Sequence, residues 1–275
     1  MTYKDVFVHV DSTSRSDARA DIAIDLAKRF DAALDVHFAE CDPYLANLAS
    51  KRPDEMFRDA AERTRIALVP KAEQAGTTLD WSETFARRDA ALCRSVIFGT
   101  RHADLAILGQ HDPREQTTSG VPSDLVEKVV LAAGRPVLTI PCIGDYQDIG
   151  SRVLIAWNAG REATRAVHDA MPFLVAAEDV VVVVINPFDR EQDHGASPGA
   201  DIHRHLATHG VDATINVIEV TDVSVADMLL SRAADYGSNL LVMGGHGKYG
   251  FPYVFEGGCT RHILAHMTTP VLMSH

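Results

Sequence analysis

An internal repeat is the feature that most constrains this fold: the second half of the 275-residue chain follows the same order of segments as the first. Two pairs of segments are close in sequence. ADLAILGQH at 103–111 corresponds to SNLLVMGGH at 238–246, and GRPVLTIP at 134–141 corresponds to TTPVLMSH at 268–275. A repeat of about half the chain indicates one structural unit built twice in tandem.

Within each copy, short apolar runs alternate with segments of helical periodicity. A run such as 240–243 is long enough for a strand buried on both faces and too short for a helix. The predicted strands are 6–10, 33–38, 79–85, 105–109 and 136–140, then 153–157, 180–185, 213–220, 240–243 and 270–273. The predicted helices are 18–30, 54–74, 90–98, 123–133, 161–175, 202–209, 225–235 and 260–267.

This alternation predicts the α/β class, with two tandem doubly wound sheets of five parallel strands and helices on both faces of each. We expect one domain at 1–143 and a second at 150–275. The linker is expected at 141–151, where Pro141, Gly144 and Gly150 break regular structure.

The strand predicted at 240–243 runs into a glycine-rich segment, with glycines at 244, 245, 247, 250, 257 and 258, and a helix follows. Glycine allows the backbone to approach a phosphate closely, and the unpaired N–H groups at a helix start point toward the anion. The order strand, glycine-rich loop and helix therefore predicts an anion-binding site.

Two common phosphate motifs do not fit this segment. A P-loop requires glycine where the chain has Val242, and Ser or Thr where it has Tyr249. The dinucleotide pattern G-x-G-x-x-G is matched at 245–250. However, that match does not open directly into a helix, and Pro270 stands where a ribose-binding acid is expected.

A third spacing fits better. Gly244, two residues, Gly247, nine residues and then Gly257-Gly258 resembles the nucleotide-binding loop of the universal stress protein family, Gly-x2-Gly-x9-Gly-Ser/Thr. Three glycines match in register after a strand that ends in Met243. The departure is Gly258, which keeps a backbone N–H but lacks the side-chain hydroxyl. The resemblance covers nearly the whole chain, as two tandem domains.

The resemblance implies the strand order 3-2-1-4-5, shared with the adenine-nucleotide α-hydrolases, and an adenine nucleotide (ATP, ADP or AMP), with Mg as an accompanying ion. It also implies the site residues, with Ala156, Trp157 and Asn158 at the adenine end, backbone contacts from Val184, and Met243, Gly244, Gly247, Gly257, Gly258 and Cys259 around the ribose and phosphates. Asn158 replaces the Asp usual in the family, offering one acceptor and adding a donor. Lys248 or Arg261 would add positive charge.

The first copy departs further from the same pattern. Its loop reads Gly109-Gln110-His111-Asp112, and Pro122-Ser123 replaces the later Gly-Ser pair. Asp112 would place a carboxylate where phosphate should lie, and Pro122 removes an N–H donor. We therefore expect the first copy not to bind, although Asp11 remains at the family's adenine and ribose position.

Charge and cysteine usage exclude several classes of partner. The formal net charge of −12 argues against general binding to nucleic acids or anionic membranes. No apolar run approaches the ~20 residues of a membrane span, and MTYKD does not begin a signal peptide. The four cysteines are scattered without paired spacing. We expect a cytoplasmic protein.

Catalytic and metal signals are weak. No nucleophile with a paired base emerges, so we assign no catalytic residue and expect at most slow ATP hydrolysis. His205 and His209 lie at i, i+4 on a predicted helix, but no third ligand is fixed by spacing, so we expect an exposed face and no metal site. Cys259 has two readings, a thiol of lowered pKa at a helix start or a small packing residue. Trp157 would either stack on adenine or belong to the core.

The resulting hypothesis is a cytoplasmic stress-response protein that binds an adenine nucleotide in its C-terminal domain and acts as a signalling or protective module. The main alternative is a nucleotide-free scaffold or interaction protein of the same fold, and a third is an enzyme of the related α-hydrolase or flavoprotein group. The strands at 136–140 and 270–273 are expected to pair, which would make one chain a pseudo-dimer. A homodimer remains open.

Overall fold

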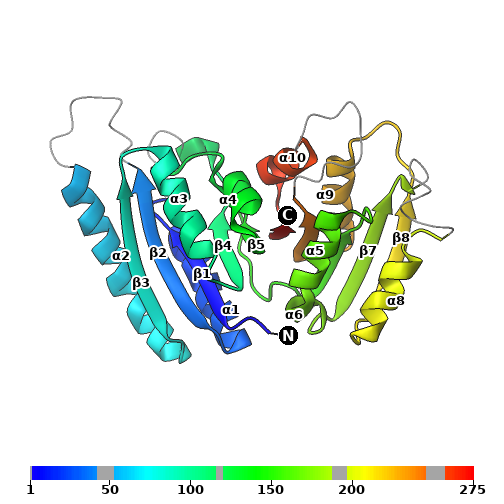
Figure 1. Ribbon diagram of the computed structural model, residues 1–275, viewed down its shortest axis with the longest axis horizontal. Helices are drawn as coiled ribbons and strands as arrows, with labels where there is room; N and C mark the ends of the chain where they lie inside the picture. The colour runs from blue at the N-terminus through cyan, green and yellow to red at the C-terminus, as the bar shows by residue number, and fades with distance from the viewer. Residues whose placement is uncertain (1, 42–52, 116–119, 188–196, 246–257) are drawn as a thin grey trace. The chain divides into compact units, whose positions relative to one another are not determined.

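The computed structural model describes residues 2–41, 53–115, 120–187, 197–245 and 258–275 (Figure 1). The chain divides into two compact units, Thr2–Asp145 and Tyr146–His275. Each unit is an α/β structure with the element order that the repeat predicts.

The N-terminal unit alternates strands and helices throughout. Its elements are β1 (Asp5–Val10), α1 (Ser16–Phe30), β2 (Ala33–Cys41), α2 (Pro53–Ala75), β3 (Leu79–Ala86), α3 (Asp89–Thr100), β4 (Leu105–Gly109), the 3-10 turn η1 (Pro113–Glu115), α4 (Leu125–Ala133) and β5 (Val137–Ile140). Every strand pairs in parallel with its neighbour, in the order β3-β2-β1-β4-β5. Helices α1 and α2 pack together on one face of this sheet, and α3 and α4 on the other (Figure 1).

The C-terminal unit repeats this topology. Its elements are β6 (Arg152–Ala156), α5 (Arg161–Asp169), α6 (Met171–Leu174), β7 (Asp179–Ile185), α8 (Ala200–Thr208), β8 (Thr214–Ile218), α9 (Val225–Asp235), β9 (Leu240–Gly244), α10 (Gly258–His266) and β10 (Val271–Ser274). The parallel pairing gives the order β8-β7-β6-β9-β10. Counted within each unit, both sheets have the strand order 3-2-1-4-5, so the predicted fold class is confirmed.

The central strands are buried on both faces. In β7 the residues Val180–Val184 are at most 6% exposed, and in β9 Leu240, Leu241 and Val242 are fully buried. Continuous apolar runs of this kind are typical of parallel strands that are covered by helices on both sides. The loops that follow the carboxyl ends of these buried strands lie at one edge of each sheet. Ligands bind at this edge in folds of this type.

One predicted element is wrong in detail. The helix expected over 161–175 is two helices, because α5 ends at Asp169 and α6 begins at Met171. The break has a clear cause in Pro172, which lacks an N–H donor and whose ring would collide with the carbonyl of His168 in a continuous helix. Ala170 is both the C-cap of α5 and the N-cap of α6.

Among the helices in the described ranges, none combines the length and apolar character that crossing a bilayer requires.

Candidate functional site

The two ends of the predicted C-terminal site lie side by side at one edge of the sheet. Strand β6 pairs with β7 on one side and β9 on the other, so the winding reverses at β6. Ala156, at the end of β6, is in register with Met243, near the end of β9. Crevices at such reversal points are the usual ligand positions of open parallel sheets.

The adenine end of the predicted site is formed by the turn after β6. Trp157 donates its backbone N–H to the carbonyl of Val183 over 2.9 Å, and its side chain is partly exposed. Asn158 is exposed, and its Oδ1 accepts the N–H of Gly160 over 2.9 Å. The Asn158 acceptor is therefore already used in the turn that leads into α5. Its Nδ2 group has no partner among the described residues, which leaves a donor for a ligand.

Val184, also predicted to be a site residue, contributes through packing in β7. Its side chain is fully buried, and its backbone is in register with Val217 of β8. The packing of Val184 therefore fixes the position of the strand beside β6 and does not depend on a ligand.

Gly244, the last residue of β9, lies directly against the start of α5. A Cβ atom at Gly244 would lie 2.6 Å from the backbone N of Ala163 and 2.7 Å from the carbonyl carbon of Glu162. Real Cβ contacts are longer, so glycine is required here by helix packing. The next N–H, that of Gly245, is donated to the carbonyl of Ser274 over 2.8 Å.

The phosphate end of the predicted site is described in part. Gly247, Gly257 and Lys248 lie outside the described residues. Gly258 is the first residue of α10, and Cys259 follows it in the first turn. The first N–H groups of an α-helix lack intrahelical partners and carry partial positive charge, so this turn offers donors to an anion.

Burial raises the pKa of the Cys259 thiol to about 11. The thiol is therefore protonated at neutral pH, and the reading of Cys259 as a reactive thiol of lowered pKa is wrong. Cys259 is partly buried at the start of α10, which agrees with its reading as a small packing residue.

Helix α10 is held in place by a hydrogen bond to α9. His262 Nε2 lies 2.7 Å from Asp227 Oδ1, and the Ser224 hydroxyl donates to Asp227 Oδ2 over 2.6 Å. Hydrogen bonds from Ser224 and His262 lower the pKa of Asp227. These contacts join the second turn of α10 to the first turn of α9.

The histidine pair on α8 does not extend to a metal site in the described structure. The rings of His205 and His209 are 4.9 Å apart between centroids, and both side chains are exposed. Across the described residues, no group of three or more His, Cys, Asp or Glu side chains is arranged to hold a metal ion.

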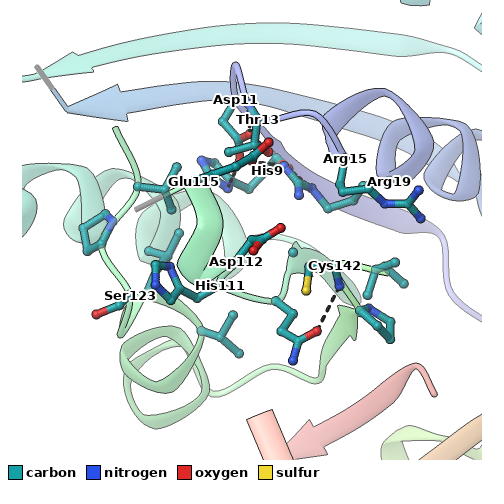
Figure 2. Close-up of a pocket in the computed structure, with 18 residues that line it drawn as sticks. His9, Asp11, Thr13, Arg15, Arg19, His111, Asp112, Glu115, Ser123 and Cys142 are labelled. Atoms are coloured by element: carbon teal, nitrogen blue, oxygen red, sulfur yellow. Dashed lines mark hydrogen bonds and ion pairs between the residues drawn. The ribbon is translucent and has the colours of Figure 1, made fainter. Parts of the chain in front are cut away.

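The N-terminal unit has a pocket at the corresponding edge of its sheet, at the carboxyl ends of β1 and β4 (Figure 2). Its lining includes His9, Asp11, Arg19, His111, Asp112 and Glu115. The space inside is about 40 Å³, which is enough for only a few water molecules.

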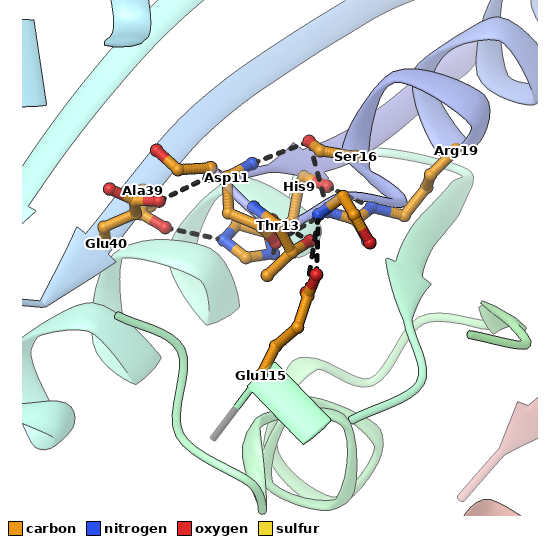
Figure 3. Close-up of polar contacts among 10 residues, drawn as sticks. His9, Asp11, Thr13, Ser16, Arg19, Ala39, Glu40 and Glu115 are labelled. Carbon is orange, nitrogen blue, oxygen red and sulfur yellow. Dashed lines mark hydrogen bonds and ion pairs between the residues drawn. The ribbon is translucent and has the colours of Figure 1, made fainter. Parts of the chain in front are cut away.

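A buried ion pair lies at this edge (Figure 3). Arg19 Nη2 lies 2.6 Å from Asp11 Oδ2, and both side chains are 4% exposed. Arg19 Nε also donates to the carbonyl of His9 over 2.7 Å. Burial raises the pKa of Asp11, but the charge of Arg19, together with His9 and Thr13, outweighs this effect and lowers it. Asp11 is therefore ionised and paired.

His9 is buried beside this pair and is neutral. Its Nε2 lies 2.9 Å from the carbonyl oxygen of Ala39, so this nitrogen carries the hydrogen. Burial lowers the pKa of His9. Its Nδ1 is 3.8 Å from Asp11 Oδ2, which is too long for a hydrogen bond, so we do not treat this contact as an ion pair.

Asp112 lies in the loop that follows β4. Its carboxylate is held by Arg114, with Arg114 Nη2 at 2.6 Å from Oδ2 and the Arg114 backbone N at 2.9 Å from Oδ1. These hydrogen bonds lower the pKa of Asp112 to about 2. A carboxylate therefore lines the pocket, at the position where the sequence places it.

Sequence reasoning missed Arg19. A signal exists, because Arg19 shares a helix face with Ile22, Leu26 and Phe30, which are all buried. An arginine on an apolar face indicates either a partly exposed chain or a buried charge with a partner. The partner, Asp11, is identified only by the structure.

Comparison with known proteins agrees with this architecture. The model of the universal stress protein family matches residues 151–275. Over nearly the whole chain, the structure is similar to a universal stress protein from Archaeoglobus fulgidus DSM 4304, with 14% identity, a TM-score of 0.72, and coverage of 98% of this chain and 97% of the other. A candidate universal stress protein from Pseudomonas aeruginosa UCBPP-PA14 has 14% identity, a TM-score of 0.57, and coverage of 99% and 93%. Identities this low establish similarity of fold. No curated protein matches the chain by sequence.

Proposed function

We propose that the C-terminal unit, which the model of the universal stress protein family matches over residues 151–275, binds an adenine nucleotide. The proposed site lies at the carboxyl ends of β6 and β9, with the base near Trp157 and Asn158 and the phosphates near the first turn of α10. The observation that carries the proposal is the register of Ala156 with Met243, followed by the glycine spacing that leads to Gly258.

The chemistry of this site suits a phosphate without requiring a side-chain cation. Gly258 has no side chain that would cover the start of α10, and the backbone N–H groups there are directed toward the helix start. An anion at that point also interacts favourably with the helix dipole. The formal charge of −12 does not oppose such local binding, because the donors are backbone amides.

For the base, the described residues offer one donor and one flat surface. The Nδ2 group of Asn158 can donate to a ring nitrogen of adenine, since Oδ1 is used by Gly160. Trp157 is partly exposed directly before it, and an indole ring can stack on a base. We infer binding in preference to turnover, because Gly258 lacks the hydroxyl of the related loops. Mg would accompany the phosphates as a counterion.

We further propose that the output is signalling or stress protection through a surface that depends on the bound nucleotide. A cytoplasmic setting is part of this proposal. It is supported by the four cysteines, all of which are free thiols.

Two observations favour the alternative, a nucleotide-free scaffold of the same fold. Gly244 is required by packing against α5, so the presence of glycine there does not by itself imply a phosphate. The N–H of Gly245 is also committed to Ser274. The two functions differ in whether the first turn of α10 receives a ligand.

Titration calorimetry with ATP, ADP and AMP tests the proposal. We expect saturable binding of one nucleotide per chain. Gly258→Asp should abolish it, since an acid in the first turn is compatible with a helix but repels phosphate. Ser123→Asp, at the corresponding position of the N-terminal unit, is the matched control and should leave binding unchanged. Absence of heat above background with all three nucleotides would refute the proposal.

A further inference from the structure

The last residue of the fourth strand has different neighbours in the two units. At the end of β9, Gly244 packs against the backbone of α5, and a Cβ there would lie only 2.6 Å from Ala163 N, closer than van der Waals contact allows. At the end of β4, the corresponding Gly109 faces the guanidinium of Arg19, and a Cβ there would collide with Arg19 Nη1. The Arg19 guanidinium therefore lies between the carboxyl ends of β1 and β4. The winding of the N-terminal sheet reverses at β1, and ligands of open parallel sheets usually bind at such a point.

The surroundings of the Arg19 guanidinium are those of a bound cation. It is enclosed, with 4% of the side chain exposed, and it contacts a carboxylate oxygen of Asp11 at 2.6 Å. The carbonyl of His9 accepts from Nε at 2.7 Å, and Ser16 Oγ lies 3.5 Å from Nη2. The planar guanidinium suits this set of acceptors.

The backbone amides of the same loop are also committed (Figure 3). Thr13 N donates to Asp11 Oδ1 over 2.8 Å, Ser14 N donates to Glu115 Oε1 over 3.1 Å, and Ser12 N donates to Glu40 Oε1. Three consecutive N–H groups that would otherwise attract an anion are thus satisfied by carboxylates of the chain itself.

We propose that Arg19 is a built-in occupant of the ligand position in the N-terminal unit, and that together with these carboxylates it closes this unit to external ligands. The unit is then permanently in its filled state, and only the C-terminal unit is left to respond to a ligand. This inference goes beyond the proposed function, because it concerns the other unit and holds whether or not the C-terminal unit binds a nucleotide.

Removal and replacement of the guanidinium test the proposal. The chain has two tryptophans, Trp81 in β3 and Trp157 after β6. In a Trp157→Phe background, the fluorescence of Trp81 reports unfolding of the N-terminal unit alone. Arg19→Ala should lower the urea midpoint of this unit. Methylguanidinium chloride at millimolar concentration should then raise the midpoint saturably toward that of the parent, and ethylammonium chloride should do so less.

The parent protein is the control, because its site is already filled and its midpoint should not respond to methylguanidinium at these concentrations. An Arg19→Ala chain with an unchanged midpoint would overturn the proposal. So would a lowered midpoint that methylguanidinium does not raise, or raises equally in the parent.

If Arg19→Ala does not fold, a second variant tests the proposal. Asp11→Asn with Arg19→Met removes both charges, keeps an acceptor for Thr13 N and refills the space with an apolar chain. Under the proposal this double variant folds and its midpoint does not respond to methylguanidinium. A double variant that also fails to fold, or that methylguanidinium stabilises, contradicts the proposal.

Discussion

Arg19 Nη2 and Asp11 Oδ2 are 2.6 Å apart at the edge of the N-terminal sheet, and neither side chain is more than 4% exposed. A buried charge needs a partner and full hydrogen bonding, because water cannot solvate it. The contact joins the end of β1 to the first turn of α1. It therefore holds together the edge at which ligands bind in folds of this type.

Neutralising one partner should destabilise the N-terminal unit strongly. Asp11→Asn keeps an acceptor for Thr13 N but leaves Arg19 buried without a counter-charge, a change that typically costs about 3–5 kcal/mol. Urea unfolding followed by Trp81 fluorescence measures the loss. Lys71→Met, which removes the exposed ion pair with Asp21, is the control and should cost less than about 1 kcal/mol. Equal effects of the two changes would contradict the account.

A second prediction concerns Asp35 in β2. Burial, with the nearby charges of Asp5 and Asp80, raises the pKa of Asp35 from 3.8 to about 6. The folded state therefore favours the protonated carboxyl, and stability is lost as the pH rises from about 4 through about 6. Asp35→Asn should stabilise the N-terminal unit at pH 8 by about 1–2 kcal/mol, after allowance for partial exposure. The gain should vanish at pH 4. A gain independent of pH would rule out this cause.

His37 should have the opposite pH dependence. Its ring lies 2.8 Å from Ser82 Oγ and 3.3 Å from Ser95 Oγ, and burial, with a smaller effect of His9, lowers its pKa from 6.5 to about 4. The folded state favours the neutral ring, so stability is lost as the pH falls from 6.5 toward 4. The full effect is about 2–3 kcal/mol.

The test of this prediction is the slope of unfolding free energy against pH. His37→Phe removes two hydrogen bonds and lowers stability at pH 7, but it should reduce the slope between pH 6.5 and 4. Buried His9, whose pKa is also lowered, should keep part of the slope. His102→Gln, at an exposed position of the same unit, should leave the slope unchanged. A slope that His37→Phe leaves unchanged would show that other groups cause the acid sensitivity.

Gly244 provides a test that separates packing from ligand binding. Gly244→Ala would place a Cβ 2.6 Å from the backbone of α5, and such overpacking typically costs about 1–3 kcal/mol. In a Trp81→Phe background, Trp157 fluorescence should record this loss in the C-terminal unit. An unchanged stability together with lost nucleotide binding would assign the glycine to the ligand and not to the helix.

Much of the fold was predictable because the strongest signals are local. Runs such as Val180–Val184 identify strands that are buried on both faces, and the repeat confirms their order. The break at Ala170 was missed because Ala166, Val167, Ala170, Met171 and Leu174 form an uninterrupted buried stripe across it. The pattern therefore continued while Pro172 ended the helix.

The site was predictable only in part, because one residue type can satisfy two constraints. At Gly244, close packing of α5 and close approach of a phosphate both select glycine, and the sequence cannot separate them. The N-terminal pair could not be derived, since Asp11 and Arg19 are eight positions apart and only the fold brings their side chains together. The positions of Gly247 and Gly257 remain predictions.

Hydrogen–deuterium exchange of the full chain, measured by mass spectrometry with and without saturating ATP, tests the central claim most directly. The account predicts slower exchange in peptides covering 156–163 and 258–264, where backbone amides meet the nucleotide. It predicts no change in peptides covering 9–19 and 105–115, where the chain already fills its own site. Unchanged exchange in the first pair of peptides, or protection confined to the second pair, would contradict it.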